Sequence, residues 1–297
     1  MTDRVLVLNP KSGGGKRAAQ TRRLAAEHGF VVRESGGPGE TRTIAETAAA
    51  EGAKMVVAAG GDGTLNEVVS GVDDAEGLSR TVLGVVPAGT GNNFAERVGI
   101  RDVEHAFEVL DAGRRRWLDL GEANGRLFVN SCVGGLTADA SVATTPEMKR
   151  KFGVLAYVIA TMREYRDFEG LDVDVRDAAG EELWTGEAIG VLVGNGRRFV
   201  GELGTQANME DGLLNVVLIR DRPASSLATD EAIRRFLRRD ANHLTRIRAP
   251  YLHLTVHDDR EAQFSLDGEA LATDELTARS QVGCLRFCVG ERYRPVP

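Results

Sequence analysis

The chain has 297 residues, of which 42% are hydrophobic and 27% are charged, proportions that are ordinary for a globular protein. A formal net charge of −7 excludes a general nucleic-acid binder, because affinity for a phosphate backbone needs clustered Lys and Arg in surplus. No apolar run reaches the ~18 residues that span a bilayer, and the first residues lack a signal-peptide pattern. We therefore expect a cytoplasmic protein without a nucleic-acid partner. The length favours two domains over the alternative of one large α/β domain.

The first third of the sequence alternates short apolar runs with amphipathic segments, which predicts strands and helices in βαβα order. The expected strands are residues 5–8, 31–33, 55–59 and 83–86, and the expected helices are residues 16–27, 41–51, 65–72 and 103–112. The strands are apolar throughout rather than alternating, which indicates a parallel sheet covered by helices on both faces. We expect an α/β domain over residues 1–118.

After about residue 118 the pattern changes to many short strands separated by turn signals. The expected strands are residues 126–133, 171–176, 187–193, 213–219, 253–257, 262–266 and 284–289, with helices at residues 151–165 and 225–238. Such a series of short strands is typical of a β-sandwich or barrel. The second domain is placed at residues 119–297, and its last strand either stays in it or returns to the first domain.

Three glycine-rich loops each follow an expected strand of the first domain and precede an expected helix. Loop 1 (residues 9–16) reads NPKSGGGK, loop 2 (residues 60–67) reads GGDGTLNE and loop 3 (residues 87–93) reads PAGTGNN. Backbone N–H groups of a glycine turn and the dipole of a helix N-terminus together favour phosphate. Because successive parallel strands end on one crevice, we expect the three loops to face the same ligand. The alternative is three ordinary βα turns.

Two of these loops carry details that limit the interpretation. Loop 1 is not a Walker A motif, because Arg17 follows Lys16 where that motif needs Ser or Thr. In loop 3, Asn93 is expected to cap the helix that follows.

Several acidic residues of the second half are candidates for a site. Asp267 and Glu269, in FSLDGEA, would project to the same side of an extended segment and could serve one site. The alternative is an exposed Asp-Gly hairpin turn with incidental acids. Asp119 either belongs to a site or caps the surface, and Asp211, in EDGLL, either binds a hard cation or forms a turn.

The motifs, in order and spacing, resemble the diacylglycerol kinase catalytic family, which includes bacterial lipid kinases and the sphingosine and ceramide kinases. They are the NPKSG of loop 1, the GGDGTLNE of loop 2, the PAGTGN of loop 3, the DGL at residues 211–213 and the LDGE at residues 266–269. The resemblance implies an NAD kinase-like fold with a Rossmann-like N-terminal α/β domain, a C-terminal β-sandwich domain and an active site between them. It also implies ATP and Mg²⁺ as donor and metal, and a diacylglycerol-like lipid as acceptor.

The resemblance assigns the nucleotide contacts to loop residues. They are Asn9, Pro10, Lys11, Ser12, Gly13, Ser35, Gly61, Asp62, Gly63, Thr64, Leu65, Asn66, Glu67 and Thr90. Asp62 is expected to hold the Mg²⁺–phosphate assembly. Many family members have Asp where this chain has Asn93, so a role that needs charge at that position is not carried over.

The resemblance also assigns roles to acids of the second half. Glu269 is implied to be the general base for the lipid hydroxyl, and Asp267 either binds metal or orients that base. Asp119 is implied to join the metal and catalytic network. Asp211, with backbone carbonyls of Asn208 and Leu213, is implied to hold a structural Mg²⁺ or Ca²⁺.

Two alternatives to a lipid kinase stay open: a kinase of a soluble acceptor such as NAD or a sugar phosphate, and a non-catalytic nucleotide-binding module. A lipid substrate implies transient association with a membrane surface. The basic residues 149–151, beside an apolar helix, suit anionic lipid, although ordinary core packing of that helix is the alternative. The oligomeric state is open, and a homodimer is one option.

Overall fold

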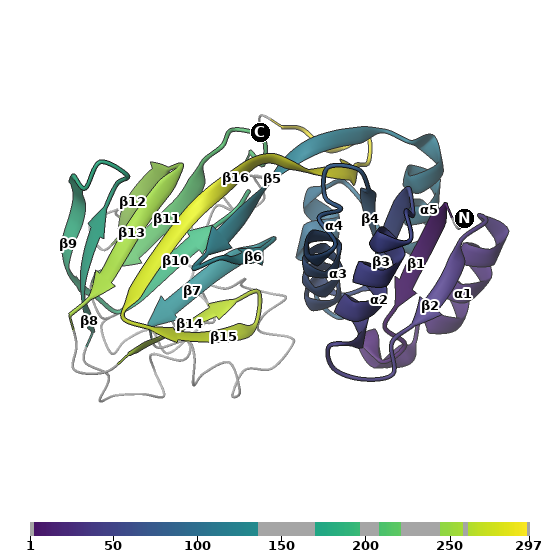
Figure 1. The fold of residues 1–297 in the computed structure, drawn as a ribbon, viewed down its shortest axis with the longest axis horizontal. Helices are drawn as coiled ribbons and strands as arrows, with labels where there is room; N and C mark the ends of the chain where they lie inside the picture. The colour runs from purple at the N-terminus through teal and green to yellow at the C-terminus, as the bar shows by residue number, and fades with distance from the viewer. Residues whose placement is uncertain (1–2, 136–169, 197–207, 221–243, 258–260, 296–297) are drawn as a thin grey trace, which may run out of the picture. The chain divides into compact units, whose positions relative to one another are not determined.

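The computed structural model describes residues 3–135, 170–196, 208–220, 244–257 and 261–295 (Figure 1). The chain divides into two compact units. Unit 1 comprises Met1–Leu120 and Val282–Pro295, and unit 2 comprises Gly121–Gln281 with Val296–Pro297. Unit 1 thus contains the expected first domain together with a segment from the end of the chain.

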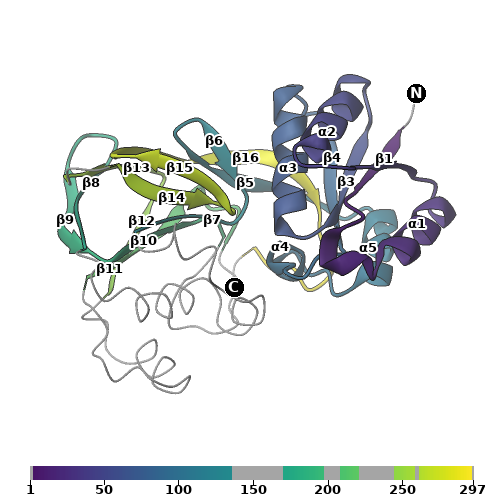
Figure 2. The same cartoon turned by 90° about the horizontal axis from the view of Figure 1, so that it is seen from below.

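Unit 1 is built on a parallel sheet with helices on both faces. Its strands are β1 (Arg4–Leu8), β2 (Val31–Glu34), β3 (Met55–Gly60) and β4 (Val82–Pro87), paired in the order β2-β1-β3-β4. Its helices are α1 (Ala18–Glu27), α2 (Glu40–Ala50), α3 (Asp62–Asp74), α4 (Asn93–Arg97) and α5 (Val103–Ala112), with a short 3₁₀ turn at Ser12–Gly15. Figure 2 shows α2 and α3 on one face of the sheet and α1 and α5 on the other. Every residue of β3 and β4 is buried, which explains their continuous apolar sequences.

Unit 2 is a β-sandwich. One sheet has the order β12-β11-β10-β7-β14-β15. The other contains β9, β8, β13 and β16 in that order, and β5 pairs with both β16 and β6. The strands are β5 (Arg115–Ala123), β6 (Arg126–Phe128), β7 (Ser131–Gly135), β8 (Leu171–Arg176), β9 (Glu182–Ala188), β10 (Gly190–Gly194), β11 (Leu214–Ile219), β12 (Leu244–Ala249), β13 (Tyr251–Val256), β14 (Ala262–Leu266), β15 (Glu269–Thr273) and β16 (Glu275–Cys288). Both sheets contribute to one core, which includes Phe128, Val191, Leu252 and Phe264. The predicted fold class, an α/β domain followed by a β-sandwich, is confirmed.

Several predicted elements were wrong in detail. Residues 126–133 form two strands, β6 and β7, because the chain turns between them. Residues 187–193 likewise divide between β9 and β10, and residues 284–289 are the end of the much longer β16. The helices expected at residues 151–165 and 225–238 and the basic residues 149–151 lie outside the described residues. In the described part of the chain, no helix is both long and apolar enough to cross a bilayer.

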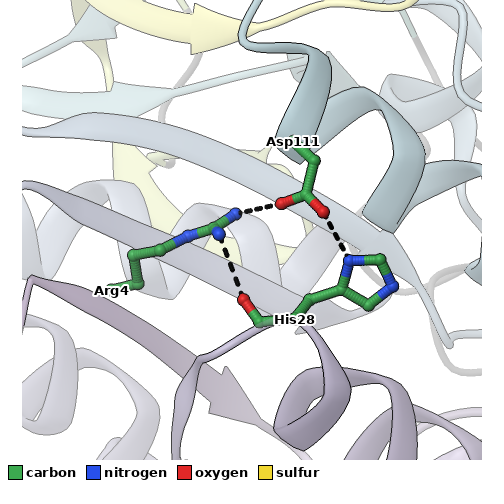
Figure 3. Close-up of polar contacts among 3 residues, drawn as sticks. All are labelled: Arg4, His28 and Asp111. Atoms are coloured by element: carbon green, nitrogen blue, oxygen red, sulfur yellow. Dashed lines mark hydrogen bonds and ion pairs between the residues drawn. The ribbon is translucent and has the colours of Figure 1, made fainter.

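A polar cluster ties three elements of unit 1 together (Figure 3). Arg4, at the start of β1, donates to the backbone carbonyl of His28 at 3.0 Å and to the Asp111 carboxylate of α5 at 2.8 Å. The same carboxylate lies 2.5 Å from Nδ1 of His28 at the end of α1. Because Arg4 begins β1 and loop 1 follows the other end of that strand, the cluster stabilises the edge of the sheet away from the glycine loops.

Candidate active site

The three glycine loops meet in unit 1, and their backbones are in contact. The N–H of Asp62 donates to the carbonyl of Gly91 at 3.2 Å, and the N–H of Ala88 donates to the carbonyl of Gly60 at 3.0 Å. A Cβ added at Gly89 would lie 2.3 Å from the Cα of Gly61, which is too close for any side chain at this position. Glycine at these positions therefore allows loops 2 and 3 to pack backbone against backbone.

Loop 1 joins the same assembly. Gly13 has φ of +58°, and a Cβ there would lie 2.5 Å from the carbonyl oxygen of Ala88. Arg17 donates to the carbonyl of Gly89 at 2.9 Å, and Oγ of Ser12 lies 3.4 Å from Oγ1 of Thr64. The loops are thus held by one another and by the strands that precede them, before any ligand binds.

Helix α3 begins at Asp62, three residues before the expected start, with Gly61 as its N-cap residue. The N–H groups of Gly63 and Thr64 consequently lie in the first turn, where helix geometry supplies no intrahelical acceptor. A helix of 13 residues with such a turn favours an anion at its N-terminus. The buried Oδ1 of Asn66 also has no hydrogen-bond partner among the described residues. The first-turn N–H groups and the helix dipole fit the phosphates of a nucleotide, whereas the Asn66 oxygen is an acceptor and suits a ligand group that donates a hydrogen bond.

The carboxylate of Asp62 has a role that the sequence did not suggest. One oxygen accepts from the backbone N–H and from Nδ2 of Asn93, both at 3.0 Å, and the other accepts from the N–H of Phe94 at 3.0 Å. Asp62 therefore caps α4 and joins loop 2 to loop 3. The prediction that Asn93 caps this helix was wrong: the N-cap residue is Asn92, whose side chain bonds to Gly89 instead.

The other predicted nucleotide contacts occupy varied environments. In loop 1, Oδ1 of Asn9 accepts from the N–H of Lys11 at 3.1 Å, which closes a turn around Pro10, and Nζ of Lys11 donates to the carbonyl of Gly36 at 3.1 Å. Ser35 is buried beyond β2, and Leu65 is a core residue of α3. Glu67 is half-buried, and Thr90 is exposed in loop 3.

In unit 2, Asp267 lies in a turn rather than in an extended strand. It follows β14 with φ of +49°, and Gly268 follows with φ of +108°, so the two residues form the tight hairpin turn that precedes β15. The argument that Asp267 and Glu269 project to the same side assumed an extended backbone between them, which the turn replaces; the alternative of an Asp-Gly hairpin turn is what the structure has.

The Asp267 carboxylate binds three consecutive backbone N–H groups. It accepts from Val129 at 2.6 Å, from Asn130 at 3.1 Å and from Ser131 at 2.9 Å. These bonds satisfy the donors of the connection between β6 and β7, where the predicted strand breaks. With its oxygens engaged in this way, Asp267 is suited to orient the hairpin that carries Glu269.

Glu269 itself is paired with a residue that the sequence did not single out. Nη2 of Arg126 donates to its carboxylate at 2.6 Å, and Nη1 of Arg126 donates to the carbonyl of Ala270 at 3.0 Å. The Glu269 side chain is 52% exposed, so this pair is accessible to a substrate. No local pattern marks Arg126, because its partner is 143 residues away.

The remaining acids differ in environment. Asp119, on β5, is only 3% exposed and accepts from the N–H of Gly283 at 2.7 Å, so the alternative of surface capping was wrong. Asp211 lies in a turn in which one carboxylate oxygen accepts from the N–H of Leu213 at 3.0 Å. The other oxygen accepts from Arg248 at 2.6 Å. Asn208 accepts from the N–H of Glu210 at 2.8 Å.

These contacts bear on the expected metals. Among the described residues, no group of three or more His, Cys, Asp or Glu side chains is arranged to hold a metal ion. At Asp211, Arg248 is the present partner of one carboxylate oxygen, so a cation held there with the backbone carbonyls of Asn208 and Leu213 would share or replace that partner. That site stays a prediction.

None of the three cysteines is suited to nucleophilic chemistry. Burial raises the pKa of the Cys132 thiol, and the nearby Asp267 raises it further. Burial likewise raises the pKa of Cys284 to about 11 and raises that of Cys288. All three thiols therefore stay protonated at neutral pH, which excludes a thiolate nucleophile.

Comparisons with known families agree with the motifs and with the fold. Residues 3–123 match the family described as the diacylglycerol kinase catalytic domain, and residues 131–289 match the YegS C-terminal NAD kinase beta sandwich-like domain. A Pseudomonas aeruginosa protein named probable lipid kinase YegS-like is 32% identical over 287 residues, which cover 95% of this chain and 92% of that protein. A Shigella flexneri protein named probable lipid kinase YegS is 29% identical over 276 residues, covering 90% and 89%.

Solved structures resemble the fold. A Bacillus anthracis str. Sterne structure has a TM-score of 0.80 with 22% identity, covering 99% of this chain and 97% of its own. Another from that organism, described as a diacylglycerol kinase, has a TM-score of 0.73 with 19% identity, covering 99% of each chain. Yeast NADH kinase complexed with NADH has a TM-score of 0.52 with 13% identity, covering 98% and 84%. The solved structures show the fold, and the sequence matches show the family. The chain belongs to the diacylglycerol kinase catalytic-domain family, as its motifs predict.

Proposed function

We propose that this protein is a lipid kinase, which transfers the γ-phosphate of ATP to a hydroxyl group of a diacylglycerol-like lipid. The observation that carries the proposal is the packing of three glycine loops around the N-terminus of α3. These loops lie in residues 3–123, which match the diacylglycerol kinase catalytic domain. Relatives that align over nearly the whole chain are named probable lipid kinases, which supports a lipid as the acceptor.

In this proposal the loops bind the triphosphate. The first-turn N–H groups of Gly63 and Thr64 donate to phosphate oxygens, as do backbone groups of loop 1, and Ser12 adds a hydroxyl donor. Lys11 supplies a positive charge once it leaves the carbonyl of Gly36. A bound Mg²⁺ would neutralise charge on the β- and γ-phosphates, which is the usual contribution of the metal in phosphoryl transfer.

Asp62 is assigned chiefly to holding the loops together. Its oxygens already accept from Asn93 and Phe94, so Asp62 would hold a Mg²⁺–phosphate assembly only with the lone pairs that remain. Its removal is expected to disorganise the phosphate site as well as to take away a negative charge.

Glu269 is proposed as the general base. Its carboxylate takes the proton from the acceptor hydroxyl as the hydroxyl oxygen bonds to the γ-phosphorus, and the bond from that phosphorus to the β,γ-bridging oxygen breaks to release ADP. Arg126 keeps the carboxylate oriented before the acceptor arrives. Asp267 positions the same hairpin through the β6–β7 connection.

The acceptor is tested directly with a mixture of natural lipids. The protein is incubated with a total lipid extract, Mg²⁺ and [γ-³²P]ATP, and labelled products are identified by mass spectrometry. A labelled phospholipid that forms only with the active protein supports the proposal. Label in a water-soluble product such as a nucleotide or sugar phosphate would favour the soluble-acceptor alternative, and no ATP turnover with any acceptor would favour a nucleotide-binding module.

The base is tested with Glu269→Gln, which retains the size of the side chain but cannot accept a proton at neutral pH. Turnover should fall by ~10²- to 10⁴-fold if proton removal limits the rate, while the affinity for Mg–ATP measured by calorimetry should stay near that of the wild type. Glu261→Gln, which removes an exposed acid just before β14, is the matched control and should leave both quantities unchanged. A loss of ATP affinity in Glu269→Gln would place this residue in nucleotide binding instead.

The proposal also concerns where the protein works. A diacylglycerol-like acceptor resides in a membrane, so the protein has to reach it at the membrane surface. We propose a cytoplasmic protein that associates transiently with the membrane.

A further inference from the structure

An exposed tryptophan stands out on the surface of unit 1, to which β5 up to Leu120 and β16 from Val282 belong. Trp117 lies on β5 and is 47% exposed, and the other large apolar residues exposed in the described part of the chain are Val31 and Val282. A single exposed apolar side chain is ordinary on a protein surface. Tryptophan nevertheless has a particular affinity for the interface between membrane and water, where its ring is amphipathic.

The surroundings of Trp117 are basic. The guanidinium of Arg286, on β16, lies 5.9 Å from the centroid of the Trp117 ring. Arg115 begins the same strand as Trp117 and is exposed. Strand β5, which carries Arg115 and Trp117, pairs with β16, which carries Arg286. Arg115, Trp117 and Arg286 thus form one neighbourhood.

The basic character extends into the segment that follows β16. Arg114 donates to the carbonyls of Gly290, Glu291 and Tyr293 at 3.3 to 3.4 Å, and the N–H of Val289 donates to the carbonyl of Arg114 at 3.0 Å. These bonds hold the segment that carries the exposed Arg292 and Arg294 beside the start of β5.

The charge of this region is opposite to that of the whole chain. Residues 114–117 and 286–294 contain six arginines and one glutamate, Glu291, whereas the chain as a whole has a net charge of −7. A local excess of arginines on the segments that carry and flank an interfacial ring is complementary to an anionic bilayer, where charges attract the headgroups and the indole enters the interface.

We propose that this surface, the Trp117 patch (Arg115, Trp117, Arg286, Arg292 and Arg294), docks the protein on an anionic lipid bilayer. The inference rests on the proposed function, because a lipid acceptor resides in a bilayer. It adds the surface that makes the contact and the charge of the membrane that is preferred.

The test follows the fluorescence of Trp117. The chain has two tryptophans, and Trp184→Phe leaves Trp117 as the sole indole. Vesicles of phosphatidylglycerol and phosphatidylcholine at low salt should shift its emission to the blue, and brominated acyl chains should quench it. Pure phosphatidylcholine vesicles should do neither, and raised salt should reverse the shift, since the attraction is screened. Vesicle sedimentation of the wild-type protein gives the same comparison without relying on Trp184→Phe.

The charge contribution is tested with Arg115→Gln/Arg286→Gln. A basic residue near an anionic membrane contributes about fivefold to partitioning, so the double variant should bind about 25-fold more weakly. Arg23→Gln/Arg246→Gln, which removes the same charge from exposed positions on α1 and β12, is the matched control and should bind like the wild type. Phosphorylation of lipid in vesicles should decrease with binding, whereas phosphorylation of a short-chain lipid dissolved as monomers should be unchanged.

Three results would overturn the proposal. Trp117 emission that stays unchanged while the protein sediments with anionic vesicles would assign docking to another surface. An equal response to pure phosphatidylcholine would remove the role of charge. Emission that depends on protein concentration in the absence of vesicles would identify the patch as a contact between copies of the chain. If Trp117 inserts but no lipid is ever phosphorylated, the docking surface stands and the proposed function fails.

Discussion

Nδ2 of Asn93 donates to the carboxylate of Asp62 at 3.0 Å, alongside the backbone N–H of the same asparagine. Through this contact, the first residue of α3 caps the first turn of α4, and glycine loops 2 and 3 become one structure. An asparagine suits this arrangement, because an amide donates to a carboxylate while an aspartate would repel it. The chain therefore holds loops 2 and 3 together with its own hydrogen bonds.

The first prediction concerns Asn93→Asp. The new carboxylate would lie next to that of Asp62, so the hydrogen bond becomes a repulsion and unfolding should be easier by about 1 to 2 kcal/mol in the absence of divalent metal. Two adjacent carboxylates are also a set of hard oxygen ligands, so Mg²⁺ should restore most of the lost stability. Thermal unfolding with EDTA and with excess Mg²⁺ measures both effects without an activity assay.

Asn93→Ala is the control for this change, because it removes the same hydrogen bond and adds no charge. Its loss of stability should be smaller and should not respond to Mg²⁺. If Asn93→Asp is as stable as the wild type in EDTA, then Asp62 does not hold loop 3 in solution as it does in the structure.

The sequence alone predicted the elements that depend on local periodicity. Residues 103–112, 171–176 and 262–266 were expected as α5, β8 and β14 and have those bounds, because each is an amphipathic or alternating segment between clear turn signals. The glycine loops were found for the same reason, since strand, glycine turn and helix follow one another in the sequence.

The contacts that the candidate residues make within each unit could not be predicted in this way. Asp62 binds residues 31 and 32 positions away, Asp267 binds residues more than 130 positions away, and Arg126 binds Glu269 across 143 positions. No periodicity of the sequence encodes such pairs. The strand expected at residues 126–133 was wrong for the same reason, because it is the distant Asp267 that satisfies the N–H groups at the break.

A second prediction separates the two roles that the family resemblance leaves open for Asp267. In Asp267→Asn, the new asparagine tolerates the positive φ. Its amide has only one acceptor oxygen for the N–H groups of residues 129–131, where the carboxylate has two. The free energy of unfolding should fall by about 1 to 3 kcal/mol, and turnover should fall because the hairpin that carries Glu269 is less well held. Affinity for Mg–ATP should not change. Denaturant titration, turnover and calorimetry on one preparation measure the three quantities.

Asp267→Gly provides the comparison, because it also accepts the positive φ but removes the acceptor entirely. It should be less stable than Asp267→Asn, with the same unchanged ATP affinity. A variant of normal stability that binds Mg–ATP weakly would instead show that Asp267 acts through the metal, and the orienting role would have to be abandoned.

The last prediction concerns the pH dependence of stability through Asp111. Burial alone would raise the pKa of this carboxyl, but the hydrogen bonds and charges of Arg4 and His28 outweigh burial and hold the pKa below its ordinary value. A carboxyl with a lowered pKa in the folded state stabilises that state at every pH above its unfolded pKa of about 3.9, and the contribution is lost as the pH falls through the folded pKa. Because the Asp111 side chain is 42% exposed, solvent screens the pair and the contribution should be about 1 kcal/mol or less. Asp111→Asn should therefore be less stable than the wild type at pH 7, and the difference should shrink from about pH 5 downward. Urea unfolding at a series of pH values measures this difference.

A double-mutant cycle with Arg4→Gln tests the cause, because the two changes should together cost less than the sum of each alone if Arg4 and Asp111 stabilise one another. Additive costs, or a difference that does not depend on pH, would mean that the cluster contributes through packing against Phe30 and Phe107 rather than through charge.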